Sequence, residues 1–182
     1  MREHYDFAVI GAGIAGASVA AELASGASVV LLDKEPKRGY HSTGRSAAYF
    51  YASYGSAAVR AATAASEPFF RSPPEGFTGI PLLRSRDTLF VARQNQLSRL
   101  SAFKEEISGL QEISGSDAIL RVPILDADSV AAGILETGGG DLDVDATLQG
   151  FLRLLHQRSG ALHCQREVQA LSKRPGGWLV TT

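Results

Sequence analysis

Residues 5–33 read YDFAVIGAGIAGASVAAELASGASVVLLD, and this stretch decides the fold of the chain. An apolar run at residues 7–10 predicts a buried parallel strand. Three glycines follow at G-x-G-x-x-G spacing, and the small apolar residues at 14–24 predict a helix packed closely on a sheet. A second β-branched run at residues 29–32 ends in Asp33. This order of strand, glycine turn, helix, strand and acid predicts an α/β fold with a Rossmann-like βαβ unit at its N-terminus.

Each glycine of the turn has a physical role in binding a dinucleotide. Gly11 permits a tight turn out of the strand, Gly13 lets the backbone approach a pyrophosphate, and Gly16 allows close packing of the helix. The pyrophosphate would meet the free N–H groups and the positive dipole end of the helix. Asp33 would accept hydrogen bonds from ribose hydroxyls. The pattern therefore predicts a dinucleotide site.

Composition restricts the class of protein. The chain has 182 residues, of which 45% are hydrophobic and 20% are charged, as in ordinary globular proteins. A net charge of −1 argues against nucleic acid as a partner. The single cysteine, Cys164, can form no intrachain disulfide, which fits a reducing, cytoplasmic compartment, and we interpret it as buried apolar filling. The four histidines have no metal-ligand spacing, so we expect no metal.

A membrane span is the structural alternative for the N-terminal stretch. Residues 7–24 are largely apolar, with Glu22 as their only charge. Three spaced glycines and a following β-run are atypical of a transmembrane helix. We therefore expect no membrane span.

Residues 41–55, HSTGRSAAYFYASYG, combine small hydroxylated residues with four aromatic residues. Two interpretations remain open. Ser42, Thr43 and Ser46 suit the N-terminal cap of a helix. Alternatively, the segment lies along a flat, polar ring system, with hydroxyls and backbone N–H groups facing its heteroatoms. The one arginine of the segment, Arg45, is expected to be buried.

The remaining elements follow from periodicity and turn residues. We expect strands at residues 82–91, 162–165, 168–172 and 178–181. We expect helices at residues 56–70, with Val59, Ala62, Phe69 and Phe70 inward, and at 96–110, and a short one starting at Asp126 or Asp128. A last helix is capped by Asp143 or Asp145 and has an inward stripe of Leu148, Phe151, Leu152 and Leu155. The Gly138–Gly140 run indicates a loop and a domain crossing.

The segments GAGIAGASVAAEL, LLDKE and GYHSTGRSAA together resemble the FAD-dependent D-amino acid oxidases and dehydrogenases, including the arginine-specific bacterial dehydrogenases. The resemblance continues through VRAATAAS and GGDLDVDATLQGFLR. It implies FAD as the cofactor, with Asp33 on the adenosine ribose and the backbone of Val168 at the adenine. Along the isoalloxazine and pyrophosphate it implies Ser42, Thr43, Arg45, Ser46 and Ala47. The cofactor-binding residues implied by the motif and the resemblance are Gly11, Gly13, Ile14, Ala15, Gly16, Asp33, Lys34, Ser42, Thr43, Arg45, Ser46, Ala47 and Val168.

The resemblance also implies a reaction and a set of substrate contacts. The α-hydrogen of an amino acid leaves as a hydride to flavin N5, and water hydrolyses the resulting imino acid. Tyr54 matches an active-site tyrosine of the family, whose neutral hydroxyl would hydrogen-bond the substrate; a half-buried aromatic at a helix start is the alternative. Thr88 stands where the arginine-specific enzymes have a glutamate, and Tyr49 and Tyr51 replace a histidine and a threonine.

The resemblance further implies the division of the chain. Residues 1–80 and 144–182 would form an incomplete FAD-binding domain, and residues 81–143 part of an inserted α+β substrate domain. Because such enzymes are about twice as long, we expect the isolated chain to lack closing strands and the arginines that clamp a substrate carboxylate. A same-fold enzyme acting on another amine or a 2-hydroxy acid remains open, as does a truncated nucleotide-binding fragment without activity. The electron acceptor also remains open.

Overall fold

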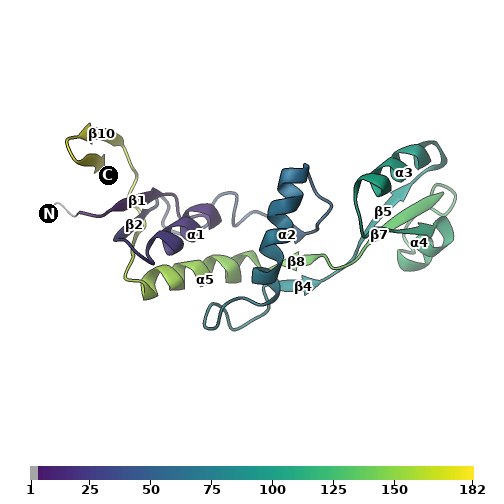
Figure 1. Ribbon diagram of the computed structural model, residues 1–182, viewed down its shortest axis with the longest axis horizontal. Helices are drawn as coiled ribbons and strands as arrows, with labels where there is room; N and C mark the ends of the chain where they lie inside the picture. Colours follow the sequence, from purple (N-terminus) through teal and green to yellow (C-terminus); the bar gives the residue numbers. More distant parts are fainter. Residues whose placement is uncertain (1–3) are drawn as a thin grey trace. The chain divides into compact units, whose positions relative to one another are not determined.

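Figure 1 shows the computed structural model of the chain, which describes residues 4–182. The chain forms two compact units. The first contains the residues up to Ala48 together with Ser72–Leu82 and Asp143–Thr182, and the second contains Tyr49–Arg71 and Leu83–Leu142. Residues 49–71 group with the second unit, whereas the predicted FAD-binding domain included them. Compact units are not the same as functional domains, so the predicted division into an FAD-binding and a substrate domain stays a prediction. Within residues 4–182, every helix is too short or too polar to span a bilayer.

The first unit has an α/β fold, as predicted. Its parallel sheet has the strand order β1-β2-β9, and a separate antiparallel hairpin joins β10 to β11. The strands are β1 (Phe7–Ile10), β2 (Val29–Leu32), β9 (Ala161–His163), β10 (Ala170–Arg174) and β11 (Gly177–Thr181). The helices are α1 (Ile14–Leu23) and α5 (Val144–Gln157). The predicted positions of β1, α1 and β2 are confirmed, whereas the last three strands begin or end up to two residues from their predicted bounds.

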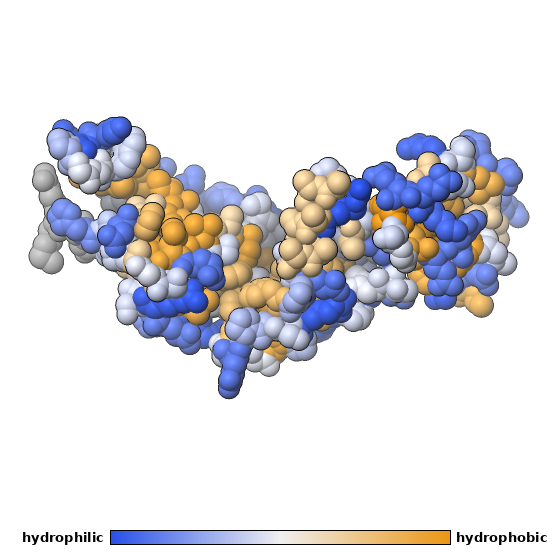
Figure 2. Space-filling model, viewed as in Figure 1, coloured by the Kyte–Doolittle hydropathy of each residue, from blue (hydrophilic) through white to orange (hydrophobic). Residues whose placement is uncertain are grey.

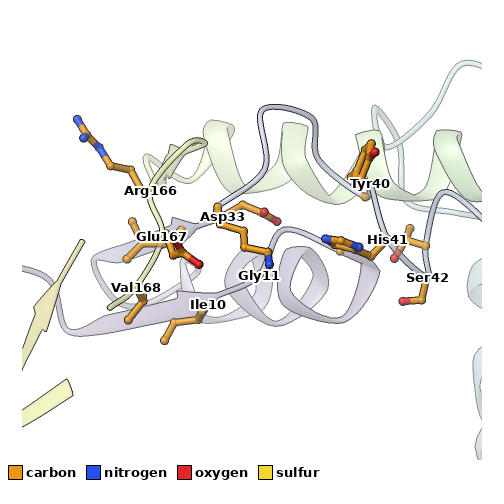
Figure 3. A pocket seen from close by; sticks show the side chains of 14 residues that line it. Ile10, Gly11, Asp33, Tyr40, His41, Ser42, Arg166, Glu167 and Val168 are labelled. Carbon is orange, nitrogen blue, oxygen red and sulfur yellow. The ribbon is translucent and has the colours of Figure 1, made fainter. Parts of the chain in front are cut away.

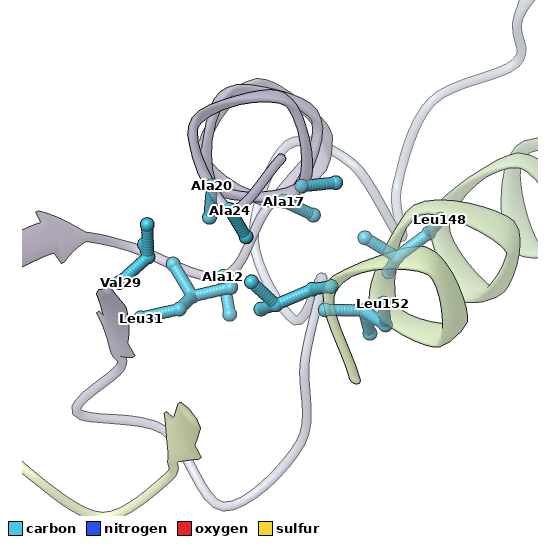
Figure 4. Packing of buried hydrophobic residues seen from close by; sticks show 10 residues of the cluster. Ala12, Ala17, Ala20, Ala24, Val29, Leu31, Leu148 and Leu152 are labelled. Atoms are coloured by element: carbon cyan, nitrogen blue, oxygen red, sulfur yellow. The ribbon is translucent and has the colours of Figure 1, made fainter. Parts of the chain in front are cut away.

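The core of this unit lies where α1 packs against β2 and α5 (Figure 4). Alanines on α1 let the two helices approach closely, since a methyl side chain adds little bulk between them. The buried members of this core are Ala12, Ala17, Ala20, Ala21, Ala24, Val29, Leu31, Leu148, Leu152 and Leu155. Phe151 is partly buried and packs against them. The predicted inward stripe of α5 is therefore confirmed.

Strand β1 is less buried than its sequence predicts. Phe7 is 45% exposed and Ile10 is 54% exposed. In the described part of the chain β1 lies at the sheet edge and pairs only with β2. A continuous apolar run identifies a strand but does not reveal how many neighbours cover it, so the prediction of burial was wrong.

The second unit contains two antiparallel sheets of three strands, ordered β3-β8-β4 and β5-β7-β6. The strands are β3 (Tyr49–Phe50), β4 (Leu83–Ser85), β5 (Thr88–Ala92), β6 (Gln111–Ser114), β7 (Ala132–Glu136) and β8 (Gly140–Leu142). The helices are α2 (Ala57–Arg71), α3 (Leu97–Glu106), which follows a 3₁₀ turn at Gln94–Gln96, and α4 (Gly115–Arg121). Ile113, Ala118 and Leu135 form a small core.

Several predictions for the second unit were wrong. The strand expected at residues 82–91 is divided between the two sheets, because Arg86 and Asp87 belong to neither. The helix expected from Asp126 or Asp128 is a turn, and β6, α4 and β7 have no counterpart in the prediction. The predicted α3 ends four residues early, at Glu106.

The inward face predicted for α2 is also incorrect in its N-terminal half. Val59 and Ala62 are exposed, and Figure 2 shows hydrophobic colour along this helix. Near the C-terminal end Phe70 packs against Phe50, with ring centroids 6.0 Å apart. Packing thus depends on which part of the helix has a neighbour, which helical periodicity cannot specify.

Candidate functional site

In the glycine turn between β1 and α1, the backbone of Gly11 lies close to the backbone of two other residues, Leu32 and Gly16. Gly11 has a φ of +100°, a conformation that other residues rarely adopt, and its N–H donates to the Leu32 carbonyl at 2.7 Å. A Cβ placed on Gly16 would lie 1.8 Å from the Gly11 carbonyl oxygen. The helix can therefore begin directly against the turn only because residue 16 has no side chain.

Asp33 faces this turn from the end of β2. Its Oδ2 accepts a hydrogen bond from the Ala12 N–H at 2.6 Å, and its Oδ1 accepts one from the Glu35 N–H at 2.8 Å. Two backbone groups thus orient the carboxylate. Since an ionised carboxylate can accept about four hydrogen bonds, capacity remains for the hydroxyls of a bound ribose.

The segment at residues 41–47 forms turns and irregular backbone instead of a helix. Thr43 is buried, and its Oγ1 accepts a hydrogen bond from the Ile14 N–H at 3.0 Å. Thr43 therefore satisfies a donor in the first turn of α1, a helix that begins twenty-nine residues earlier. Residues 41–47 therefore begin no helix of their own, and Thr43 instead accepts from the first residue of α1, whose N-cap is Gly13. Contact of Thr43 with a ligand stays a prediction.

Arg45 is exposed, so its interpretation as buried was wrong. Its guanidinium carbon lies 5.4 Å from the centroid of the Tyr40 ring. A cation over an aromatic face is a favourable arrangement at an exposed site. The arginine therefore finds a partner at the surface without entering the core.

A cavity of about 380 Å³ lies between the glycine turn, Asp33 and the segments that follow β2 and β9 (Figure 3). This volume is in the range of small-molecule sites. The predicted cofactor residues that line it are Gly11, Gly13, Asp33, Lys34, Ser42, Thr43 and Val168. The predicted residues outside its lining are Ile14, Ala15, Gly16, Arg45, Ser46 and Ala47. Cofactor contact stays a prediction for both sets.

Several residues of this lining were not predicted as cofactor contacts, among them Tyr40, His41 and Arg166. His41 Nε2 lies 2.9 Å from Glu35 Oε1, and the Arg166 N–H donates to the Asp33 carbonyl at 2.8 Å. The hydrogen bond from Arg166 to Asp33 holds the segment after β9 against the end of β2. Tyr40 and His41 directly precede Ser42, which was a usable signal, whereas the position of Arg166 depends on pairing between distant segments. Cys164, in the same region, is half-buried and free.

The predicted catalytic and substrate residues cluster in the second unit. Thr88 Oγ1 donates to the Tyr49 hydroxyl at 3.1 Å, and that hydroxyl donates to the Arg86 carbonyl. The Tyr51 ring lies 5.5 Å from Tyr49 and 5.3 Å from Tyr54 between centroids. We call Tyr49, Tyr51 and Tyr54 the tyrosine cluster. Tyr54 is 61% exposed, so its ring can be reached from solvent.

A cation is fixed beside the tyrosine cluster. The Arg86 guanidinium carbon lies 4.8 Å from the Tyr49 ring centroid, and Arg86 pairs with Asp141 at 2.5 Å. Both members of this ion pair are more than half exposed, so the pair contributes little to stability. The pair matters for geometry instead, because the Arg86 guanidinium lies over the face of the Tyr49 ring.

Comparisons with known proteins agree with this architecture. Residues 6–182 match the DAO family, described as FAD dependent oxidoreductase. Among solved structures, dithionite-reduced L-α-glycerophosphate oxidase from Mycoplasma pneumoniae with FAD bound has a TM-score of 0.85 and 18% sequence identity, over 98% of this chain and 50% of that chain.

Two other solved structures are similar to the chain. Glycine oxidase from Geobacillus kaustophilus has a TM-score of 0.80 and 20% identity, over 97% of this chain and 53% of its own. L-proline dehydrogenase from P. horikoshii has a TM-score of 0.79 and 20% identity, over 100% and 52%. At these identities the likeness shows the fold. The chain spans about half the length of the solved structures that it matches.

Proposed function

The chain belongs to the DAO family of FAD-dependent oxidoreductases, and from this premise we propose that it provides the FAD site and part of the substrate site of an enzyme that oxidises amino acids. FAD is the cofactor of the family. When bound, it supplies the two-electron oxidant, while the protein binds and orients the reactants.

The observation that carries this proposal is the orientation of the Asp33 carboxylate toward the cavity beside the glycine turn. This donor and acceptor set fits the adenosine diphosphate part of FAD. Asp33 would accept hydrogen bonds from the ribose hydroxyls, and the first turn of α1 would face the pyrophosphate. Lys34, Ser42 and Thr43 line the same cavity, and the backbone of Val168 would meet the adenine.

The proposed substrate is a D-amino acid, whose CH–NH₂ group is oxidised. The α C–H bond breaks with loss of a hydride, the nitrogen loses a proton, and water then hydrolyses the imino acid. The similar structures include enzymes named for glycine and for L-proline, which supports an amino acid as the substrate class. The D configuration rests on the resemblance of HSTGRSAA and Tyr54 to the D-amino acid dehydrogenases. Tyr54 would orient the substrate through its hydroxyl.

Anaerobic reduction of the FAD-loaded full-length protein tests this proposal without requiring the electron acceptor. D-amino acids, their L-enantiomers, glycine, L-α-glycerophosphate and a 2-hydroxy acid are mixed separately with the protein, and loss of visible flavin absorbance is followed. We expect D-amino acids to reduce the flavin fastest. Faster reduction by the hydroxy compounds would assign the alternative substrate class. Bound flavin that none of them reduces would favour a nucleotide-binding fragment.

A further inference from the structure

A buried carboxylate lies at the end of strand β7. Glu136 is 5% exposed. Burying a carboxylate is costly unless hydrogen bonds replace the lost water. The partners of Glu136 therefore indicate what this residue does.

Both oxygens of Glu136 are engaged by one residue. The Ser53 N–H donates to Oε1 at 2.9 Å, and the Ser53 hydroxyl donates to Oε2 at 2.5 Å. Ser53 is also 5% exposed. Hydrogen bonds to a charged group are the stronger kind, and two of them on one residue define its orientation as well as its position. The backbone at residue 53 is thus tied to the β5–β7 pair.

Ser53 lies in the connection between β3 and α2, between two members of the tyrosine cluster. Tyr51 precedes it by two residues and Tyr54 follows it directly. The far end of the same connection is held by Arg60, whose guanidinium donates to the Gly55 carbonyl at 2.7 Å. These two attachments hold the residues on either side of Tyr54, whose own side chain is largely exposed.

The same strand pair also reaches Tyr49. Glu136 is the register partner of Thr88 in the antiparallel β5–β7 ladder, and Thr88 Oγ1 donates to the Tyr49 hydroxyl at 3.1 Å. This pair of facing residues therefore makes two contacts. Thr88 on β5 contacts Tyr49, and Glu136 on β7 contacts Ser53, the residue before Tyr54.

We propose that Glu136 is a positioning residue, which acts through Ser53 to hold Tyr51 and Tyr54 in the arrangement required for substrate binding. This inference rests on the proposed function, since it requires that Tyr54 contact the substrate. Glu136 is not a substrate ligand here, because both of its oxygens face Ser53 and its side chain is buried.

Steady-state kinetics of the FAD-loaded full-length protein, with rates expressed per bound flavin, test the inference. Glu136→Gln preserves the shape but replaces an acceptor with an amide. Ser53→Ala removes the hydroxyl donor and retains the backbone N–H. Since misplacing a catalytic group by about 1 Å can lower rates by up to about a hundredfold, we expect Glu136→Gln to lower kcat/KM by about tenfold or more, equally for all neutral amino acids. Flavin content should be unchanged.

Coupling between the two residues separates positioning from general destabilisation. If the carboxylate acts through Ser53, the double variant should be no worse than Glu136→Gln alone, because residues of one network are non-additive. Independent, multiplying losses would overturn the inference. Glu112→Gln is the matched control, because Glu112 is an exposed acid on β6 of the same sheet, paired with Lys104 at 2.8 Å, and kcat/KM should be unchanged. Should Glu136→Gln fail to fold, Ser53→Ala decides alone, and wild-type kcat/KM in that variant overturns the inference.

Two further outcomes are informative. A loss confined to D-arginine would assign the Glu136 carboxylate to the substrate side chain and overturn the positioning role. Tyr54→Phe distinguishes this inference from the proposed function. If Tyr54→Phe lowers kcat/KM while Glu136→Gln and Ser53→Ala do not, only the positioning role fails. If Tyr54→Phe has no effect, the proposed substrate role of Tyr54 fails first.

Discussion

At the scale of single residues, two positions in the first unit decide whether the cofactor site can form. Gly16 has no room for a side chain, and Asp33 supplies a carboxylate directed at the glycine turn. The first is a steric requirement and the second an electrostatic one. They can therefore be tested by different measurements.

Asp33→Ala should weaken FAD retention. The variant loses hydrogen bonds to a charged acceptor, each worth about 1.5–3 kcal/mol, so the dissociation constant should rise by about tenfold or more. Flavin content at limiting FAD is the measurement, and Glu75→Ala, at an exposed acid of the same unit, is the control. Wild-type flavin content in Asp33→Ala would contradict the assignment.

Gly16→Ala should destabilise the protein even without FAD. The added methyl would lie 1.8 Å from the Gly11 carbonyl oxygen, and relieving such overpacking typically costs about 1–3 kcal/mol. Gly26→Ala is a matched control, because a Cβ there meets no atom within 4 Å. Denaturant unfolding of both variants gives the two free energies. Equal stability of the two variants would show that the turn relaxes freely.

At the scale of elements, either Asp143 or Asp145 could cap α5 on the sequence alone. In the structure Asp143 is the cap, and its Oδ1 accepts from the Ala146 N–H at 2.8 Å. Asp143→Ala should lower the free energy of unfolding by about 0.5–2 kcal/mol. Asp145→Ala should cost less, since Asp145 lies within the first turn, where it interacts with the helix dipole and accepts one exposed hydrogen bond from Gln149 at 3.2 Å. A larger loss in Asp145→Ala would reverse the assignment.

The paired starts of β1 and β2 should make stability depend on pH. Hydrogen bonds from the Ser28 hydroxyl and N–H lower the pKa of Asp6 below its ordinary value of 3.8. A lowered folded-state pKa stabilises the fold above the ordinary value, and the contribution is lost as pH falls through the folded pKa. The stability difference between wild type and Ser28→Ala should therefore shrink as the pH falls from about 5 through the ordinary value of 3.8 and below it. A constant difference across that range would contradict this linkage.

Elements with strong local signals were predictable from the sequence, whereas those set by distant neighbours were not. The β1–α1–β2 unit and α5 have turn glycines, a capping acid and clear periodicity, and they lie close to their predicted bounds. The division of β4 from β5 depends on pairing with β8 and β7. The exposure of Phe7 and the link from Ser53 to Glu136, eighty-three positions apart, depend on tertiary neighbours. No local pattern encodes such contacts.

At the scale of the whole molecule, the two units have separate parts in the proposed function. The first contains the residues that fit FAD, and the second contains the tyrosine cluster with Thr88 and Arg86. Affinity for the cofactor and choice of substrate should therefore respond to different sets of substitutions. Variants in the second unit can be compared at equal flavin content.

Substrate choice should depend on Thr88. A guanidinium is bound well by a carboxylate, which accepts two parallel N–H bonds and supplies the opposite charge. Thr88 offers neither, and its hydroxyl is already engaged with Tyr49. Glu136, its neighbour across the ladder, is occupied by Ser53. We therefore expect the enzyme to prefer neutral or apolar D-amino acids to D-arginine and D-lysine.

The measurement is kcat/KM for D-arginine against D-leucine and D-phenylalanine in the FAD-loaded enzyme. Thr88→Glu should raise the relative activity on D-arginine, because it restores a carboxylate beside the tyrosine cluster. Ser85→Glu, which adds an acid at an exposed position of β4, is the control and should change the ratio less. A tenfold preference of the wild type for D-arginine, equivalent to about 1.4 kcal/mol of transition-state stabilisation, would overturn the prediction. That result would mean that another acid binds the guanidinium, since the hydroxyl of Thr88 has no negative charge to pair with it.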